Sequence, residues 1–225
     1  MHQPTERIES AVAPGSLFLS AVAGAALAAG GFAIGVGATG VAGESTSFWY
    51  LSRASGFVAY LLLWGSVMWG LLLSTGTGRA WARPPQLLGA HEYLSSLSVG
   101  FACFHSLVLL GDRYVAFSLG AIIVPFAGQH QPLLVACGQV ALWLSLLLIG
   151  SFQVRRRLGG QLWRRLHYAS FAAFWLAFVH GVLVGSETAT VWATALYLGT
   201  AGTVLFLTMH RVLSTPRLQT MMAGS

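Results

Sequence analysis

The chain has 225 residues, of which 56% are hydrophobic and only 8% are charged, and its mean hydropathy is +0.70. Soluble domains carry about 25% charged residues, so this composition excludes an ordinary soluble enzyme and indicates an integral membrane protein with several spans. The net charge of +6 comes from arginines, which cluster at the ends of apolar segments. That placement is typical of membrane topology, and we expect no nucleic-acid partner.

The apolar segments predict an all-α integral membrane protein, a six-helix bundle that occupies residues 1–225 as one domain. The polar first fifteen residues lack the short basic start of a cleavable signal peptide, so we expect the first apolar segment to remain as a span. The stretch 114–127 is apolar but short and contains Pro125, which favours a re-entrant or interfacial piece. The six predicted spans, each close to the length a bilayer requires, are 16–40, 48–74, 87–110, 132–153, 166–186 and 188–210.

The arginines predict the orientation of these spans, because cytoplasmic loops carry an excess of basic residues. With the N-terminus inside, the outer side holds only Arg53 and Arg113, so both termini are expected in the cytoplasm of a bacterial inner-membrane protein. Spans three and five then run in the same direction, from inside to outside. The inner side holds Arg7, Arg79, Arg83, Arg155, Arg156, Arg157, Arg164, Arg165, Arg211 and Arg217.

Spans three and five each contain two histidines, His91 and His105 in span three and His167 and His180 in span five. Parallel spans place His91 level with His167 and His105 level with His180, with the two levels roughly 20 Å apart at a rise of about 1.5 Å per residue. Burial favours the neutral imidazole that metal binding requires. A single histidine inside a membrane is often a hydrogen-bond partner between helices, but four histidines matched in depth favour a functional site. Each pair is therefore suited to bind one haem iron from opposite faces.

The spacing in span five differs from that in span three. Fourteen residues at about 100° each return His105 to within roughly 40° of the face of His91, whereas thirteen residues leave His180 roughly 140° from His167. Span five is therefore locally overwound, or its first turn is distorted at His167, or the haem meets His167 obliquely. The sequence leaves these three possibilities open.

These residues resemble the ferric reductase-like transmembrane domain superfamily, which includes NADPH oxidases, ferric reductases and the membrane haem subunit of bacterial methionine sulfoxide reductase. The resemblance rests on His-x13-His, His-x12-His, the order of the spans and the segment VRRRLGGQLWRRLHY, and it covers about residues 48–210. It implies two b haems with iron ligands His91, His167, His105 and His180. It also implies transmembrane electron transfer from the cytoplasmic side to an outer acceptor such as ferric iron or oxygen.

The sequence departs from many members of this superfamily, in which a flavin- and NADPH-binding domain follows the last span. Here the sequence ends fifteen residues after His210. The segment GVGATG at 35–40 matches GxGxxG, but no strand precedes it, so we reject it as a nucleotide site. We expect this oxidoreductase component to take electrons from a separate flavoprotein reductase or a quinol, with FMN or FAD at the cytoplasmic face or on that partner.

Four further residues allow either a functional or a purely structural interpretation. Arg53 at the outer end of span two is suited to bind a propionate of the outer haem in a forked geometry, or to anchor the helix at the interface; for Arg113 the anchor is favoured. Phe174 lies between the haem levels, where an aromatic ring would shorten the electron path. His130 in the outer loop is expected to face solvent.

Two alternative functions remain. The first is a quinol-fed haem subunit that serves an extracytoplasmic reductase, within the same chemistry. The second is a membrane scaffold or transporter that binds haem without redox turnover, which requires polar residues that line a cavity near the middle of the membrane. The polar residues available for this in span three are Ser95, Ser96, Ser98 and Ser106.

Overall fold

The computed structural model describes residues 45–80, 82–112 and 117–214, which form helices joined by short loops, with no strand among them. Five helical stretches are long and apolar enough to cross a bilayer, so the chain is a multi-pass α-helical membrane protein. They are α2, α3, α5, the pair α6 and α7, and α8. The helices are α2 (Ser45–Thr75), η1 (Thr77–Ala80), α3 (Pro84–Val108), η2 (Leu109–Gly111), α4 (Leu119–Ile123), α5 (Pro132–Leu158), α6 (Gly160–His167), α7 (Ala169–Val184) and α8 (Val191–Leu213).

The last five predicted spans coincide with these five stretches, apart from a few residues at their ends. The first predicted span, 16–40, lies outside the described residues, together with Arg7, Arg113, Arg217 and the GVGATG motif. Within the stretch predicted as re-entrant or interfacial, the structure has the five-residue helix α4, which is far too short to cross a bilayer.

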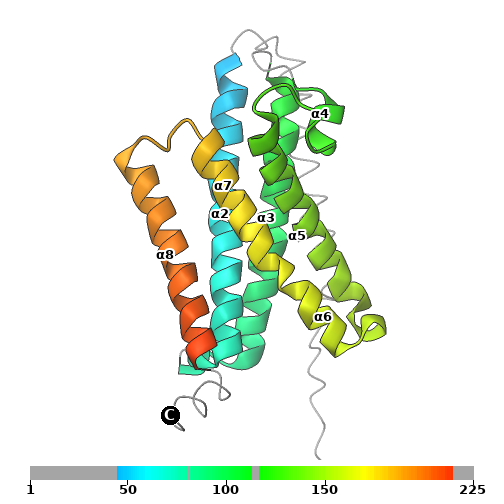
Figure 1. The fold of residues 1–225 in the computed structure, drawn as a ribbon, viewed down its shortest axis with the longest axis vertical. Coiled ribbons are helices and arrows are strands. Elements are labelled where there is room, and N and C mark those ends of the chain that lie inside the picture. Colours follow the sequence, from blue (N-terminus) through cyan, green and yellow to red (C-terminus); the bar gives the residue numbers. More distant parts are fainter. Residues whose placement is uncertain (1–44, 81, 113–116, 215–225) are drawn as a thin grey trace, which may run out of the picture.

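The long helices run up and down beside one another (Figure 1). Helix α3 packs along α2, α7 packs along α5, and α8 lies mainly against α2. The short helix α4 lies at one end of the bundle and α6 at the other. We refer to these as the α4 end and the α6 end.

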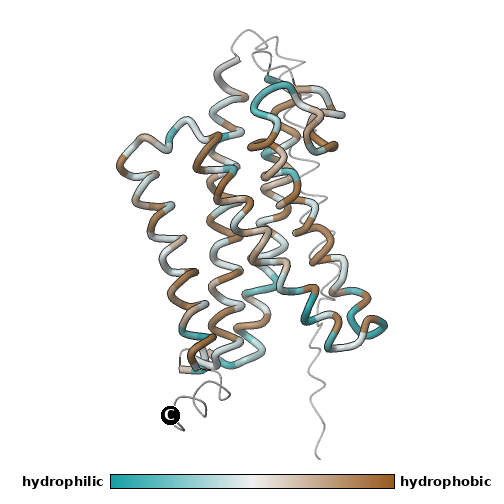
Figure 2. The backbone as a smooth tube through the Cα atoms, in the orientation of Figure 1, coloured by the Kyte–Doolittle hydropathy of each residue, from teal (hydrophilic) through white to brown (hydrophobic). Residues whose placement is uncertain are grey.

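Apolar residues cover the length of the helices and polar residues gather at the two ends (Figure 2). Val191, Leu198 and Phe206 on α8 are 87%, 67% and 69% exposed, which suits contact with lipid and not with water. The buried core joins α2, α7 and α8. Its residues are Tyr60, Val67, Leu71, Phe174, Ala193, Tyr197 and Val204.

Side chains of α5 fix α4 in place. The Gln139 amide nitrogen donates hydrogen bonds to the carbonyls of Ala121 at 2.6 Å and Ile122 at 2.8 Å. The Trp143 indole donates to the Ile123 carbonyl at 3.0 Å. These bonds satisfy backbone groups of a helix too short to satisfy them itself, and they hold α4 against α5.

Phe174 is the largest fully buried side chain, and its ring packs against Tyr60 and Trp175, with centroids 5.9 and 5.2 Å away. We expect Phe174→Ala to lower the free energy of unfolding by about 3–5 kcal/mol, because it leaves a cavity in the core. Unfolding of the purified protein in mixed detergent micelles measures this loss. Phe206→Ala, on the exposed face of α8, is the matched control and should cost far less. Equal losses in the two variants would contradict the assigned core.

Candidate functional site

The structure brings the four histidines together as two opposed pairs. The ring centroids of His91 and His167 lie 5.9 Å apart with an interplanar angle of 73°. Those of His105 and His180 lie 6.2 Å apart at 76°. The first pair is at the α6 end and the second at the α4 end, which are the pairs that matched depth predicts.

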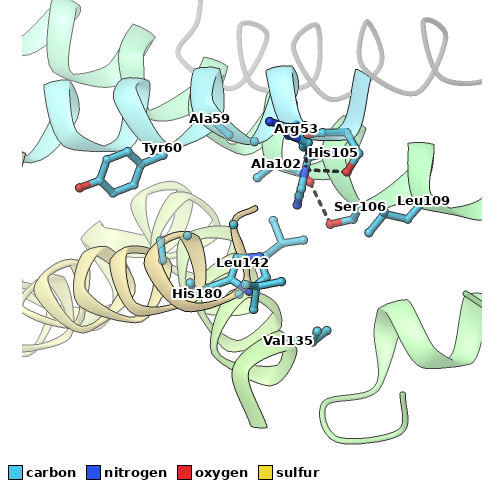
Figure 3. A pocket seen from close by; sticks show the side chains of 18 of the residues that line it. Arg53, Ala59, Tyr60, Ala102, His105, Ser106, Leu109, Val135, Leu142 and His180 are labelled. Atoms are coloured by element: carbon cyan, nitrogen blue, oxygen red, sulfur yellow. Dashed lines mark hydrogen bonds between the residues drawn. The ribbon is translucent and has the colours of Figure 1, made fainter. Parts of the chain in front are cut away.

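Each pair lines a cavity. The α4-end cavity has a volume of about 290 Å³ and includes His105, His180 and Arg53 in its lining. His105 and His180 point toward one another across it, with Arg53 beside His105 (Figure 3). The α6-end cavity has a volume of about 730 Å³ and includes His91 and His167. Cofactor sites commonly occupy about 300–1,000 Å³, so the two cavities are near or within that range.

Helix α2 holds the two histidines of α3 in the same way at both levels. His105 Nδ1 lies 2.7 Å from the carbonyl oxygen of Ser52, and His91 Nδ1 lies 2.8 Å from that of Ser66. The hydroxyl of each serine lies 3.2 Å from the same ring nitrogen. The two serines are fourteen residues apart, as are the two histidines. The antiparallel helices α2 and α3 therefore keep one register over both levels.

A glycine four residues after each serine makes room for the ring. A Cβ atom on Gly56 would lie 3.0 Å from His105 Nδ1, and one on Gly70 would lie 3.3 Å from His91 Cε1. Both contacts are closer than ordinary van der Waals packing. The absence of a side chain thus lets each imidazole reach a carbonyl on the neighbouring helix.

The same arrangement recurs between α7 and α5. His180 Nδ1 lies 2.9 Å from the carbonyl oxygen of Leu134. Gly138 follows Leu134 by four residues, and a Cβ atom there would lie 2.8 Å from His180 Cγ. Three of the four histidines thus share what we call a carbonyl–glycine cradle, a carbonyl that accepts from Nδ1 with a glycine one turn later.

The cradle determines which ring nitrogen carries the proton. A carbonyl oxygen only accepts, so Nδ1 must donate, and the neutral ring keeps a lone pair on Nε2. Histidines that bind metals almost always donate their other N–H in this way. With metal–nitrogen bonds of about 2.0–2.1 Å, two opposed imidazoles on one ion have centroids about 6 Å apart. The observed 5.9 and 6.2 Å fit this arrangement.

Within the described residues, no group of three or more histidine, cysteine, aspartate or glutamate side chains is placed to hold a metal ion. Each pair offers two nitrogen ligands only. A metal ion at either pair therefore requires further ligands from another molecule, as a porphyrin provides. The donor set and the cavities fit haem better than a protein-ligated ion.

A break in span five accounts for its shorter histidine spacing. Helix α6 ends at His167 and α7 begins at Ala169. Around Tyr168 the backbone bonds join residues three apart, from Tyr168 N to the Arg165 carbonyl at 3.2 Å and from Phe171 N to the Tyr168 carbonyl at 3.1 Å. Such bonds wind the chain more tightly than an α-helix does. These bonds directly follow His167, so they fit both local overwinding of span five and a distorted turn at His167.

Arg53 lines the α4-end cavity, as its predicted position requires. Its guanidinium forms an ion pair with Glu187 in the loop between α7 and α8, and it lies 4.0 Å from the centre of the Trp49 ring. In the structure the carboxylate partner of Arg53 is thus a protein side chain. Binding of a haem propionate by Arg53 stays a prediction.

Phe174 and His130 lie at different places relative to the cavities. Phe174 is fully buried beside Tyr60 and lines neither of the two cavities. His130 is exposed, as expected, and lies at the edge of the α4-end cavity with its ring against Phe117. The residues that line both cavities, and so form the wall between them, are Leu63, Ser98, Val99 and Ser145.

Sequence reasoning missed the cradle residues. The signal on α2 was available, because Ser52-x3-Gly56 and Ser66-x3-Gly70 repeat at the fourteen-residue spacing of His91 and His105. No comparable signal marks Leu134, because any residue can supply a backbone carbonyl.

Comparisons with protein-family models, with curated proteins and with solved structures give no match.

We expect Gly138→Ala to push the His180 ring away from the Leu134 carbonyl and to lower stability by about 1–3 kcal/mol, the usual cost of overpacking. Imidazole ¹⁵N chemical shifts of histidine-labelled protein report the loss of the Nδ1–H tautomer at His180, and unfolding in detergent reports the stability. Gly150→Ala, on the same helix with open space at its Cβ position, is the control and should leave both unchanged or raise stability slightly. An unchanged His180 signal in Gly138→Ala would refute the cradle.

Proposed function

We propose that the chain is a membrane cytochrome b of the ferric reductase-like type that transfers electrons across the bilayer. His91 and His167 would bind one haem b, and His105 and His180 a second. The observation that supports this most is the set of opposed imidazoles, three of which donate Nδ1–H to a backbone carbonyl and so aim a lone pair inward. A bound haem takes up and releases one electron at a time.

The residues between the two sites support electron transfer from one site to the other. Val99 is 2% exposed, and it lines both cavities together with Leu63, Ser98 and Ser145. The Ser98 hydroxyl donates to the Ala59 carbonyl at 3.0 Å, and the Ser145 hydroxyl donates to the Ala141 carbonyl at 2.8 Å. The hydroxyls of this wall are thus satisfied by backbone carbonyls, and the two sites are adjacent across it.

The hydroxyl pattern also favours this function over a transporter. Ser95, Ser96 and Ser106 each donate to the backbone carbonyl four residues earlier, at 2.7, 2.9 and 3.0 Å. Ser98 is bonded to α2, as described above. The protons of these hydroxyls are donated within and between helices, so few free donors remain for the hydrophilic path that a transporter requires.

The arginines indicate the direction of electron transfer across the bilayer. The described part of the α6 end holds Arg79, Arg83, Arg155–Arg157, Arg164, Arg165 and Arg211, and the described part of the α4 end holds Arg53. The α6 end is therefore assigned to the cytoplasm of a bacterial inner membrane and the α4 end to the outer side. Electrons would enter from a separate flavoprotein reductase, with FMN or FAD on that partner or at the cytoplasmic face, or from a quinol. They would leave to an outer acceptor such as ferric iron or oxygen, with Arg53 beside the outer haem.

Haem analysis of the purified protein tests this function. We expect two haems per chain and a low-spin b-type spectrum on reduction with dithionite. His91→Ala and His167→Ala should each remove the same low-spin spectral component, because that component requires both histidines of the pair. His105→Ala and His180→Ala should each remove the other spectral component.

Exposed His130→Ala is the matched control and should retain both components. Protein expressed with an ample haem supply and purified folded but without haem would refute the proposed function. If His91→Ala instead matched His105→Ala, the assigned pairing would be wrong.

A further inference from the structure

His167 is held differently from the other three histidines. Its ring stacks on Trp163, with centroids 5.0 Å apart and an interplanar angle of 24°. Within the described residues, neither ring nitrogen of His167 makes a hydrogen bond, whereas the other three rings each reach a carbonyl. Among the glycines that the structure describes, none faces His167 either. Its orientation is therefore determined by stacking and by the position of α6.

Helix α6, which carries His167, is a short segment between two breaks in the backbone. It begins after Gly159, whose φ of 77° lies in the region that favours glycine, and it ends at the tight turn around Tyr168. It has eight residues, and none of them is buried. A segment with so few buried contacts opens at low cost compared with α3 or α7.

The packing of Trp163 further lowers the cost of opening α6. Its indole nitrogen is buried and has no hydrogen-bond partner. A buried unpaired donor destabilises the closed position of α6, because exposure of the indole would restore a hydrogen bond to water. The side chain that stacks on His167 is thus itself incompletely satisfied.

The space around the two pairs also differs. The cavity at His91 and His167 measures about 730 Å³, and the cavity at His105 and His180 about 290 Å³. The larger cavity leaves room beside the rings for one of them to move. His180, in contrast, is fixed by its cradle against Gly138, where ring and backbone are in close contact.

We propose that His167 is a displaceable ligand, and that the α6-end site binds a small lone-pair donor, such as carbon monoxide or cyanide, in its place. This inference rests on the proposed haem function. In the exchange, the bond from His167 Nε2 to the iron would break and a bond from the incoming donor would form, and the oxidation state of the iron would stay the same. His91 keeps its iron bond, and the α4-end site stays closed to such ligands.

Single-site variants of the full-length chain test this exchange. His105→Ala/His180→Ala retains only the α6-end pair, and His91→Ala/His167→Ala retains only the α4-end pair. After reduction with dithionite, we expect carbon monoxide to change the haem spectrum of the first variant and not that of the second. Uptake by neither or by both haem-loaded variants would overturn the inference while leaving the cytochrome function intact.

A second measurement remains decisive if the variants do not hold haem. Carbethoxylation of haem-free wild-type chain by diethyl pyrocarbonate, followed by mass spectrometry, compares the four histidines directly. We expect His167 to react about tenfold faster than His91, His105 or His180, because local opening of α6 exposes it. Trp163→Ala should increase that difference, and Trp143→Ala, on α5, should not. Equal rates at the four histidines of a chain that does bind haem would overturn the inference alone, whereas a chain that never binds haem would refute the proposed function and the inference with it.

Discussion

The site depends on one interaction, the hydrogen bond from a histidine Nδ1–H to a backbone carbonyl on the neighbouring helix. In the apolar interior of a membrane, both groups are costly to leave unpaired, so the bond joins helix packing to ring orientation. The carbonyls of Ser52, Ser66 and Leu134 lie within helices, and an imidazole ring reaches each of them beside a glycine one turn later, where a side chain would crowd the ring. Glycine at these three places thus decides where a ring can lie and which nitrogen faces the cavity.

The register of the bundle follows from this constraint. Helices α2 and α3 repeat the bond at a fourteen-residue interval, so fixing one histidine level fixes the other. The same α2 carries Tyr60 into the core, where it bonds to Thr200 of α8 at 2.6 Å and packs against Phe174 of α7. Helix α2 is therefore the common support of both pairs. The exception is His167, which depends on the short helix α6, and the proposed displacement of this ligand rests on that difference.

Much of the fold was predictable because the lengths of the apolar segments and the positions of the arginines are read directly from the sequence. The five described spans and the depth of His91, His105, His167 and His180 follow from those patterns. The break at Tyr168 was not predictable, since nothing at Tyr168 itself marks a helix end and only the thirteen-residue spacing indicated some distortion. The partner of Arg53 was missed because Glu187 lies in a distant loop, and a sequence does not show which loop carboxylate folds back to a given helix.

Electron paramagnetic resonance of the oxidised protein tests the two-haem arrangement most directly. The imidazole planes of the two pairs are 73° and 76° apart, close to perpendicular. Low-spin ferric haem between two such rings gives a strongly anisotropic signal with a large maximal g value, whereas near-parallel rings give a rhombic one. We expect two strongly anisotropic low-spin signals, one lost in His91→Ala and the other in His105→Ala. Haem-loaded protein that shows only rhombic low-spin signals would contradict the near-perpendicular rings, and haem-loaded protein with no low-spin signal would contradict the opposed histidine pairs as the haem ligands.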